Sequence, residues 1–169
     1  IINSDGESRW YLLHIDGIVE EGYLTGCWGI SRDVTERHQY WFDLEFQANH
    51  DSLTLLPNRK ALYTDMETRL ANLASGKGGS CVALMLIDLD RFKEINDTLG
   101  HHMGDRLLKQ LGPRLKSVIS EDEGLVARLG GDEFAIVVTR QNEAEALDKA
   151  FKVLMAIKGT FELGGFRTD

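Results

Sequence analysis

The chain of 169 residues has few of the residues that mark several large classes of protein. It has only two cysteines, Cys27 and Cys81, without a metal-binding or redox spacing, which excludes a disulfide scaffold and is typical of a reducing cytoplasm. Its longest apolar run, residues 81–87, is far shorter than the roughly 20 residues of a membrane helix, so we expect no membrane contact within this chain. Basic residues are in the minority, and the net charge of −8 argues against a nucleic-acid partner.

The remaining composition is that of a folded soluble protein with an uneven charge distribution. Hydrophobic residues make up 43% of the chain and charged residues 27%. The first 50 residues contain 9 acidic and 3 basic residues, all three tryptophans and no lysine or proline, whereas residues 51–169 contain 18 acidic and 16 basic residues. This shift predicts a boundary near residue 50.

Two segments near the start are rich in aromatic and β-branched residues, which indicates strands, and the pair is interpreted as a hairpin. A long stretch without glycine or proline follows, and Asp33 or Thr35 at its start is of a type that caps helices. Such a helix between two domains can pair with its twin in a dimer. The predicted elements are strands at residues 9–15 and 22–31, a turn at Asp16-Gly17, and a helix at residues 35–50.

After residue 50, helical and strand patterns alternate. The run at residues 81–88 is continuously apolar, which is typical of a strand buried on both faces. Pro113 is expected to kink or break the helix around it. This order predicts an α/β or α+β sandwich with the apolar strand at its centre. The predicted elements are helices at residues 58–75, 90–98, 103–119 and 142–160, the strand at residues 81–88, and a hairpin at residues 124–138.

The apolar strand ends in the carboxylate of Asp88, and Asp90 follows two residues later. A carboxylate at the mouth of a buried strand is costly unless it pairs or binds a metal. The alternative is that it caps the next helix, which Asp90 alone could do. The pattern therefore favours a metal role for Asp88.

Asp132 and Glu133 follow Gly130 and Gly131 at the predicted hairpin turn. Glycines at such a turn let backbone N–H groups come close to a phosphate. Taken alone, this segment is better explained as an ordinary turn with solvated acids. Together with Asp88, however, three carboxylates could converge on a hard cation such as Mg²⁺, with substrate phosphates completing its shell.

A third set of polar residues lies around the predicted helix at residues 90–98. Lys93 could reach a phosphate as a point charge. Asn96 and Asp105 offer an amide and a carboxylate, which suit guanine because its N1–H and N2–H₂ donate to a carboxylate while its O6 accepts from an amide. Both residue types are also common in loops. The adjacent pair His101-His102 is assigned to a loop and not to a metal.

The string Gly-Gly-Asp-Glu-Phe at residues 130–134 resembles the name-giving motif of the GGDEF family of diguanylate cyclases. HDSLTLLPNR at residues 50–59 resembles the family's opening signature, and IDLDRFKEINDTLGHHMGD at residues 87–105 resembles its metal and guanine segment. Separately, residues 10–37, ending in GISRDVTER, resemble the last two strands of a PAS sensor domain with its exit motif.

The resemblance implies three parts, and a nucleotidyl-cyclase, palm-like α/β (α+β) fold with a central sheet flanked by helices. The parts are a C-terminal fragment of a PAS domain at residues 1–34, a linker signalling helix at residues 35–50, and a GGDEF domain at residues 51–169. The family's domain continues through a further strand and a terminal helix with basic residues, so the GGDEF part is expected to be C-terminally truncated.

Members of the family condense two GTP molecules into cyclic di-GMP and release two pyrophosphates. The resemblance therefore implies a Mg²⁺- or Mn²⁺-dependent diguanylate cyclase of bacterial second-messenger signalling, controlled by a PAS sensor. Each subunit would bind one GTP, so a homodimer would be required. We expect a cytoplasmic location, with any membrane anchor upstream in a longer parent protein.

The resemblance also assigns a role to each matching residue. The implied roles are metal binding by the carboxylates of Asp88 and Asp132 and the backbone carbonyl of Leu89; a further metal contact or activation of the 3′-hydroxyl by Glu133; phosphate contact by Lys93; guanine recognition by Asn96 and Asp105; and GTP binding by Phe92, Gly130 and Gly131.

The sequence departs from the family pattern in two further places. Leu55 stands where the opening motif usually has glycine, which is expected to alter a turn. The product-inhibition motif, RxxD, is absent, because residues 121–124 read Glu-Asp-Glu-Gly. The alternative to an active enzyme is a GTP-binding or dimerisation module that has kept the signature without catalysis. A polymerase-like or adenylyl-cyclase-like transferase would share the metal chemistry but not the five-residue turn.

Overall fold

The computed structural model describes residues 8–76, 80–163 and 166–168. The chain divides into two compact units, Ile1–Phe46 and Gln47–Asp169, and each is described by itself. No helix among the described residues combines the length and the apolar composition that a membrane span requires.

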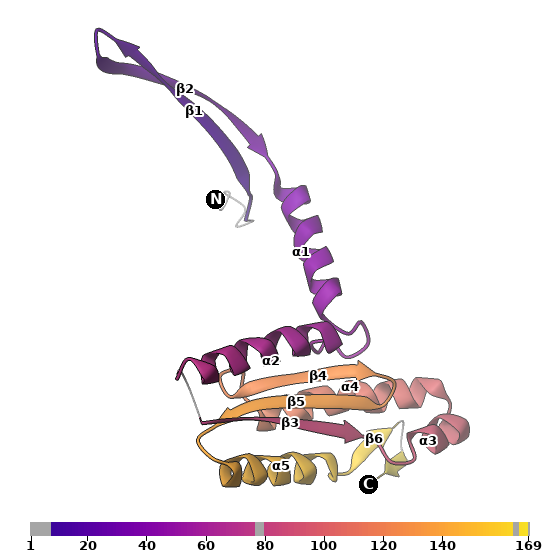
Figure 1. The fold of residues 1–169 in the computed structure, drawn as a ribbon. Helices are drawn as coiled ribbons and strands as arrows, with labels where there is room; N and C mark the ends of the chain where they lie inside the picture. Colours follow the sequence, from indigo (N-terminus) through magenta and orange to yellow (C-terminus); the bar gives the residue numbers. More distant parts are fainter. Residues whose placement is uncertain (1–7, 77–79, 164–165, 169) are drawn as a thin grey trace. The chain divides into compact units, whose positions relative to one another are not determined.

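The first unit contains an antiparallel hairpin followed by a helix (Figure 1). The predicted turn at Asp16-Gly17 is wrong, because Gly17 lies within a strand and pairs with Cys27. The chain instead reverses at Glu21-Gly22, where both φ angles are positive, 51° and 82°, and such a turn matches the right-handed twist of paired strands. The elements are β1 (Tyr11–Glu20), β2 (Tyr23–Asp33) and α1 (Thr35–Asn49), so the predicted helix is confirmed.

Large apolar side chains of the hairpin are exposed on both of its faces. Leu12 and Ile15 lie on opposite faces of β1, and they are 58% and 64% exposed. Trp28 on β2 is 52% exposed. Among the described residues, the hairpin pairs with no third strand. A two-stranded hairpin is only marginally stable alone, and its exposed apolar faces are available to pack against another surface.

The second unit is built on a three-stranded antiparallel sheet in the order β3-β5-β4, with β5 in the middle (Figure 1). The helices predicted at residues 58–75 and 142–160 are confirmed, and Asn58 and Asn142 cap them by accepting the N–H groups of Ala61 and Glu145. The elements are α2 (Arg59–Ala74), β3 (Cys81–Asp88), α3 (Phe92–Leu99), α4 (His101–Val118), β4 (Gly124–Gly130), β5 (Glu133–Arg140), α5 (Glu143–Ile157), β6 (Phe161–Leu163) and β7 (Phe166–Thr168).

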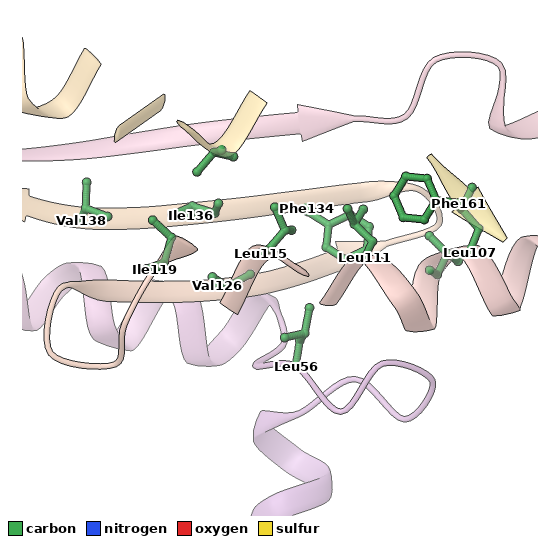
Figure 2. Packing of buried hydrophobic residues seen from close by; sticks show 12 residues of the cluster. Leu56, Leu107, Leu111, Leu115, Ile119, Val126, Phe134, Ile136, Val138 and Phe161 are labelled. Carbon is green, nitrogen blue, oxygen red and sulfur yellow. The ribbon is translucent and has the colours of Figure 1, made fainter. Parts of the chain in front are cut away.

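Alternate residues of β5 enter two hydrophobic clusters, one on each face of the sheet. Phe134 and Ile136 pack with Leu111 and Leu115 of α4 in the larger cluster (Figure 2). On the opposite face, the smaller cluster consists of Leu62 of α2 with Ala127, Ala135 and Val137. The sheet is therefore covered by helices on both faces, as a layered α/β fold requires.

The prediction that residues 81–88 form a central strand buried on both faces is wrong for the described part of the chain. β3 is an edge strand of the sheet, and its exposure alternates along its length. Val82 packs in the cluster under α2, but Leu84 and Leu86 farther along the same face are 47% and 71% exposed. The edge position could not be predicted, because a continuous apolar run does not indicate which strand lies in the middle of the sheet.

Two other local predictions differ from the structure. The helix predicted from residue 103 begins at His101, so Gly100 alone separates α3 from α4 and the expected loop is absent. Asp105 and the pair His101-His102 consequently lie in the first turns of α4. Pro113 does not break α4, which continues to Val118, so of the two outcomes expected there only the kink stays a prediction.

Candidate active site

Asp88 and Glu133 are cross-strand partners in the antiparallel ladder of β3 and β5. Residues directly opposite each other in such a ladder point to the same face of the sheet, so the two carboxylates are neighbours. Asp132 immediately precedes Glu133 in the turn between β4 and β5. The end of β3, this turn and α3 all lie at the same end of the sheet (Figure 1), which gathers the three predicted metal-binding carboxylates there.

The turn that carries Asp132 depends on its two glycines. Gly130 has a φ of 140° and Gly131 a φ of 55°. The first value is essentially restricted to glycine. A Cβ atom built on either residue would meet nothing within 4 Å, so the space above the turn is open. The glycines are therefore needed for the backbone conformation, and they leave a backbone surface that a ligand can approach.

The side chain of Arg128 on β4 stabilises this turn through hydrogen bonds. The sequence analysis did not single out this arginine. Its Nε and Nη2 atoms donate to the carbonyl of Gly131 at 3.1 and 2.6 Å, and its Nη1 donates to Asp51 at 2.9 Å. The residue is buried, with 9% of its surface exposed. A signal was present in the sequence, because Arg128 is the only charged residue in the otherwise apolar run Gly124–Gly130.

Asp51 joins the opening motif to this arrangement. Its carboxylate accepts the N–H of Thr54 at 2.8 Å and the Thr54 hydroxyl at 2.6 Å, besides the bond from Arg128. Burial raises the pKa of Asp51, but the hydrogen bonds from Thr54 and Arg128 outweigh burial and hold the pKa below its ordinary value. Asp51 is therefore a structural carboxylate that stays ionised.

Leu55 lies in the tight turn closed by these bonds, and its N–H donates to the carbonyl of Asp51. Its φ of 56° is in the left-handed region, which is unfavourable for leucine. The expectation that leucine in place of glycine alters the turn stays a prediction. Leu55 itself adopts a left-handed backbone conformation, and its side chain is 59% exposed.

The predicted guanine-binding residues come from two consecutive helices. Phe92 and Asn96 lie four residues apart on α3 and are half-buried, while Asp105 lies on α4 and is exposed. Lys93, in the first turn of α3, is also exposed. The single-residue link at Gly100 holds the two helices together, and the N–H of Gly100 donates to the carbonyl of Asn96 at 2.9 Å.

Several of these polar groups have no protein partner within the part of the chain that the structure describes. In that part, no hydrogen bond or ion pair engages the side chains of Asp88, Lys93, Asn96, Asp105 or Asp132. Within the same described residues, Glu133 makes an ion pair only with Arg59, whose Nη2 lies 3.7 Å from Oε2 of Glu133, and both side chains are exposed. Polar groups gathered at one end of a fold without partners are available to a ligand.

The donor set at this end of the sheet fits a hard divalent cation that also binds a substrate. Asp88, Asp132 and the carbonyl of Leu89 offer oxygen atoms only, which suit Mg²⁺ or Mn²⁺. Among the described residues, no three side chains of the Asp, Glu, His and Cys types form a preorganised metal cage. Mg²⁺ usually retains water and substrate phosphates in its shell, so one or two carboxylates suffice for such a site.

The position of the family's product-inhibition motif is occupied by an internal ion cluster. Glu123 accepts from Lys149 Nζ at 2.9 and 3.0 Å and from Arg140 Nη2 at 3.0 Å. The hydrogen bond from Lys149 is the main cause that lowers the pKa of Glu123 to about 2. This carboxylate ties together β4, β5 and α5 at the end of the sheet opposite to the Gly130-Gly131 turn.

Comparison with known proteins identifies the family. The family model described as "Diguanylate cyclase, GGDEF domain" matches residues 48–164, and the chain therefore belongs to the GGDEF family. It is similar to the signaling protein YkoW of Bacillus subtilis, 39% identical over 83% of this chain and 17% of YkoW. It is also similar to the cyclic di-GMP phosphodiesterase NbdA of Pseudomonas aeruginosa, 41% identical over 72% of this chain and 15% of NbdA.

Solved structures support the same assignment. The GGDEF domain of TpbB from Pseudomonas aeruginosa matches with a TM-score of 0.65 and 38% identity, covering 70% of this chain and 69% of that structure. The fold is therefore that of a GGDEF, nucleotidyl-cyclase-like domain. The chain spans less than a fifth of the length of YkoW and of NbdA.

Proposed function

We propose that this chain carries a diguanylate cyclase domain that condenses two GTP molecules into cyclic di-GMP. The observation that carries the proposal is the pairing of Asp88 with Glu133 beside the open Gly130-Gly131 turn, in a member of the GGDEF family. In this reaction the 3′-hydroxyl oxygen of one GTP bonds to the α-phosphorus of the other, and the bond to the bridging oxygen of pyrophosphate breaks. Repeating the step in the opposite direction closes the ring and releases the second pyrophosphate.

Bound Mg²⁺ or Mn²⁺ would neutralise the phosphate charge that develops during transfer. Asp88, Asp132 and the carbonyl of Leu89 would hold it. Glu133 would either add a contact to it or accept the proton of the attacking 3′-hydroxyl, and Lys93 would contact the phosphates. The open turn would let backbone N–H groups approach the nucleotide.

Guanine would be read by the amide of Asn96 and the carboxylate of Asp105. Guanine donates from N1 and N2 to a carboxylate and accepts at O6 from an amide N–H, whereas adenine presents a different pattern on that edge. The lack of protein partners for both side chains within the described residues supports this role. Phe92, one turn before Asn96, would provide an apolar wall.

A homodimer would be needed, because each subunit offers one site and the reaction joins two GTP molecules. The exposed aromatic residues of α1 support pairing through this helix, since Tyr40, Trp41 and Phe42 are 64%, 66% and 63% exposed. The sequence resemblance supports a PAS sensor that regulates the enzyme through α1. Use of GTP and the two free cysteines fit a cytoplasmic location.

A non-catalytic, GTP-binding regulatory domain is the second candidate. It is favoured by the similarity to NbdA, a protein named for cyclic di-GMP hydrolysis and not for synthesis. The two candidates differ in chemistry at the same site, so one experiment separates them.

The test is incubation of the purified chain with GTP and Mg²⁺, with chromatographic detection of cyclic di-GMP and pyrophosphate, beside a direct GTP-binding titration. Formation of both products supports the cyclase, provided that Asp132→Ala abolishes it. GTP binding without product supports the regulatory module. Absence of binding and of product overturns both.

A further inference from the structure

Gly104 occupies a position in α4 where glycine is unfavourable unless another requirement selects it. It is buried and lies within a helix, where alanine is the better residue. The φ angle of Gly104 is not positive, so the backbone conformation does not require glycine there. The reason must therefore lie in what surrounds it.

The space that a side chain at residue 104 would fill is already taken by two of the predicted GTP-binding residues. A Cβ atom on Gly104 would collide with the amide oxygen of Asn96 and would lie 3.0 Å from both its Cγ atom and the Cζ atom of Phe92. Real Cβ contacts are essentially never below 3.0 Å, so Asn96 would have to move. The absence of a side chain at Gly104 thus lets α4 approach α3 at Asn96.

We propose that Gly104 is a positioning residue for recognition of the nucleobase, an inference that rests on the proposed function. Asp105 is the next residue on α4, so the approach at Gly104 sets the separation between its carboxylate and the amide of Asn96. Guanine spans this pair with its O6 on the amide and its N1–H and N2–H₂ on the carboxylate. A side chain at residue 104 displaces the amide and loses the bond to O6, while contacts to ribose and phosphate remain.

Gly112 on the same helix provides a matched control. It is also buried, but a Cβ atom there would lie 3.4 Å from the nearest atom, Leu56 Cδ1, which is an ordinary contact. Gly104→Ala and Gly112→Ala therefore make the same chemical change in the same helix, and only the first disturbs Asn96.

The experiment measures dissociation constants of GTP, ITP and ATP for the full chain and both variants in Mg²⁺, with thermal unfolding recorded in parallel. Gly104→Ala should weaken the binding of GTP and ITP, which share O6, by about tenfold and leave the affinity for ATP nearly unchanged. The preference for guanine over adenine should therefore fall. Gly112→Ala should retain the wild-type preference. Equal weakening of all three nucleotides, or an unchanged preference in Gly104→Ala, overturns the inference.

A second pair of variants keeps the test decisive if Gly104→Ala folds poorly. In Asn96→Ala the colliding amide is gone, and Phe92 need move only a few tenths of an ångström. Adding Gly104→Ala to Asn96→Ala should then cost little further GTP affinity, and the double variant should unfold near the temperature of Asn96→Ala. Additive losses in affinity would overturn the inference. If the unchanged chain binds no GTP, the proposed function itself fails and the inference fails with it.

Discussion

Arg128 and Asp51 form a partly buried ion pair, 2.9 Å between Nη1 and Oδ1, that joins the opening motif to the hairpin of the candidate active site. The same guanidinium donates twice to the carbonyl of Gly131. Its position therefore links the Asp51 turn to the backbone that carries Asp132. Lysine cannot reproduce this arrangement, because its single ammonium lacks the planar fork.

Arg128→Lys should accordingly lower both stability and turnover. We expect a loss of about 1–3 kcal/mol in the free energy of unfolding, since lysine cannot keep the hydrogen bonds to both the carbonyl of Gly131 and the carboxylate of Asp51. Urea unfolding measures this loss. Cyclic di-GMP formation should fall more than GTP affinity, because the turn is displaced while the guanine residues are not. Arg106→Lys, on an exposed position of α4, is the control and should change neither quantity.

Asp88→Asn should raise stability while it abolishes activity. Asp88 and Glu133 are like charges directly opposite each other, an arrangement that costs about 0.2–1 kcal/mol. Removing one charge should recover that amount in urea unfolding without Mg²⁺, while turnover falls by at least about 100-fold through loss of a metal ligand. Asp97→Asn, an exposed residue of α3, should leave turnover unchanged. A destabilised but active Asp88→Asn would contradict the site.

Local chemistry made parts of this fold predictable. The hairpin at residues 124–138 is confirmed as β4 and β5, because Gly130-Gly131 between two apolar runs is a strong turn signal. Helices α2 and α5 are likewise confirmed near their predicted bounds, since Asn58 and Asn142 both cap helix starts. These features depend on residues within a few positions of one another.

Long-range relationships were not predictable in the same way. Nothing local distinguishes an edge strand from a central one, so β3 was expected at the centre of the sheet. The contact between Arg128 and Asp51 joins residues 77 positions apart, and no periodicity reports such a pair. The collision of a side chain at Gly104 with Asn96 likewise emerges only when α3 and α4 are packed.

Leu55→Gly should stabilise the protein. The left-handed φ of 56° costs a non-glycine residue about 1–2 kcal/mol, and the leucine side chain is 59% exposed, so little burial is lost. Glycine also loses more backbone entropy on folding, which leaves a net gain of about 0.5–1 kcal/mol. Leu55→Ala removes the same side chain without relieving the backbone, and it should be less stable than Leu55→Gly in urea unfolding. Equal stability of the two variants would exclude strain at this turn.

Added cyclic di-GMP should not inhibit turnover through residues 121–124. The arginine and aspartate of the RxxD motif are replaced by Glu121 and Gly124. The structure also leaves no room for the aspartate, since a Cβ atom on Gly124 would collide with the carbonyl of Val137 and lie 2.7 Å from Val138 Cγ1. Initial rates measured with increasing product should stay constant at saturating GTP. Inhibition that persists at saturating GTP would contradict this expectation.

Stability at acid pH should depend on Glu123 in a defined window. Its pKa is lowered from an ordinary value of 4.5 to about 2, first by the hydrogen bond from Lys149. Because the unfolded chain binds the proton more readily, the stabilisation is complete above about pH 4.5 and is lost as the pH falls toward 2. Urea unfolding between pH 2 and 7 should therefore show that the free energy of unfolding of wild type exceeds that of Glu123→Gln by a constant margin above this window. Below the window the two free energies should converge.

The control is Glu121→Gln, a change at a neighbouring exposed residue that breaks no ion pair within the described residues, and it should show no such convergence. A margin between wild type and Glu123→Gln that is independent of pH would mean that the cluster with Lys149 and Arg140 does not stabilise the ionised carboxylate.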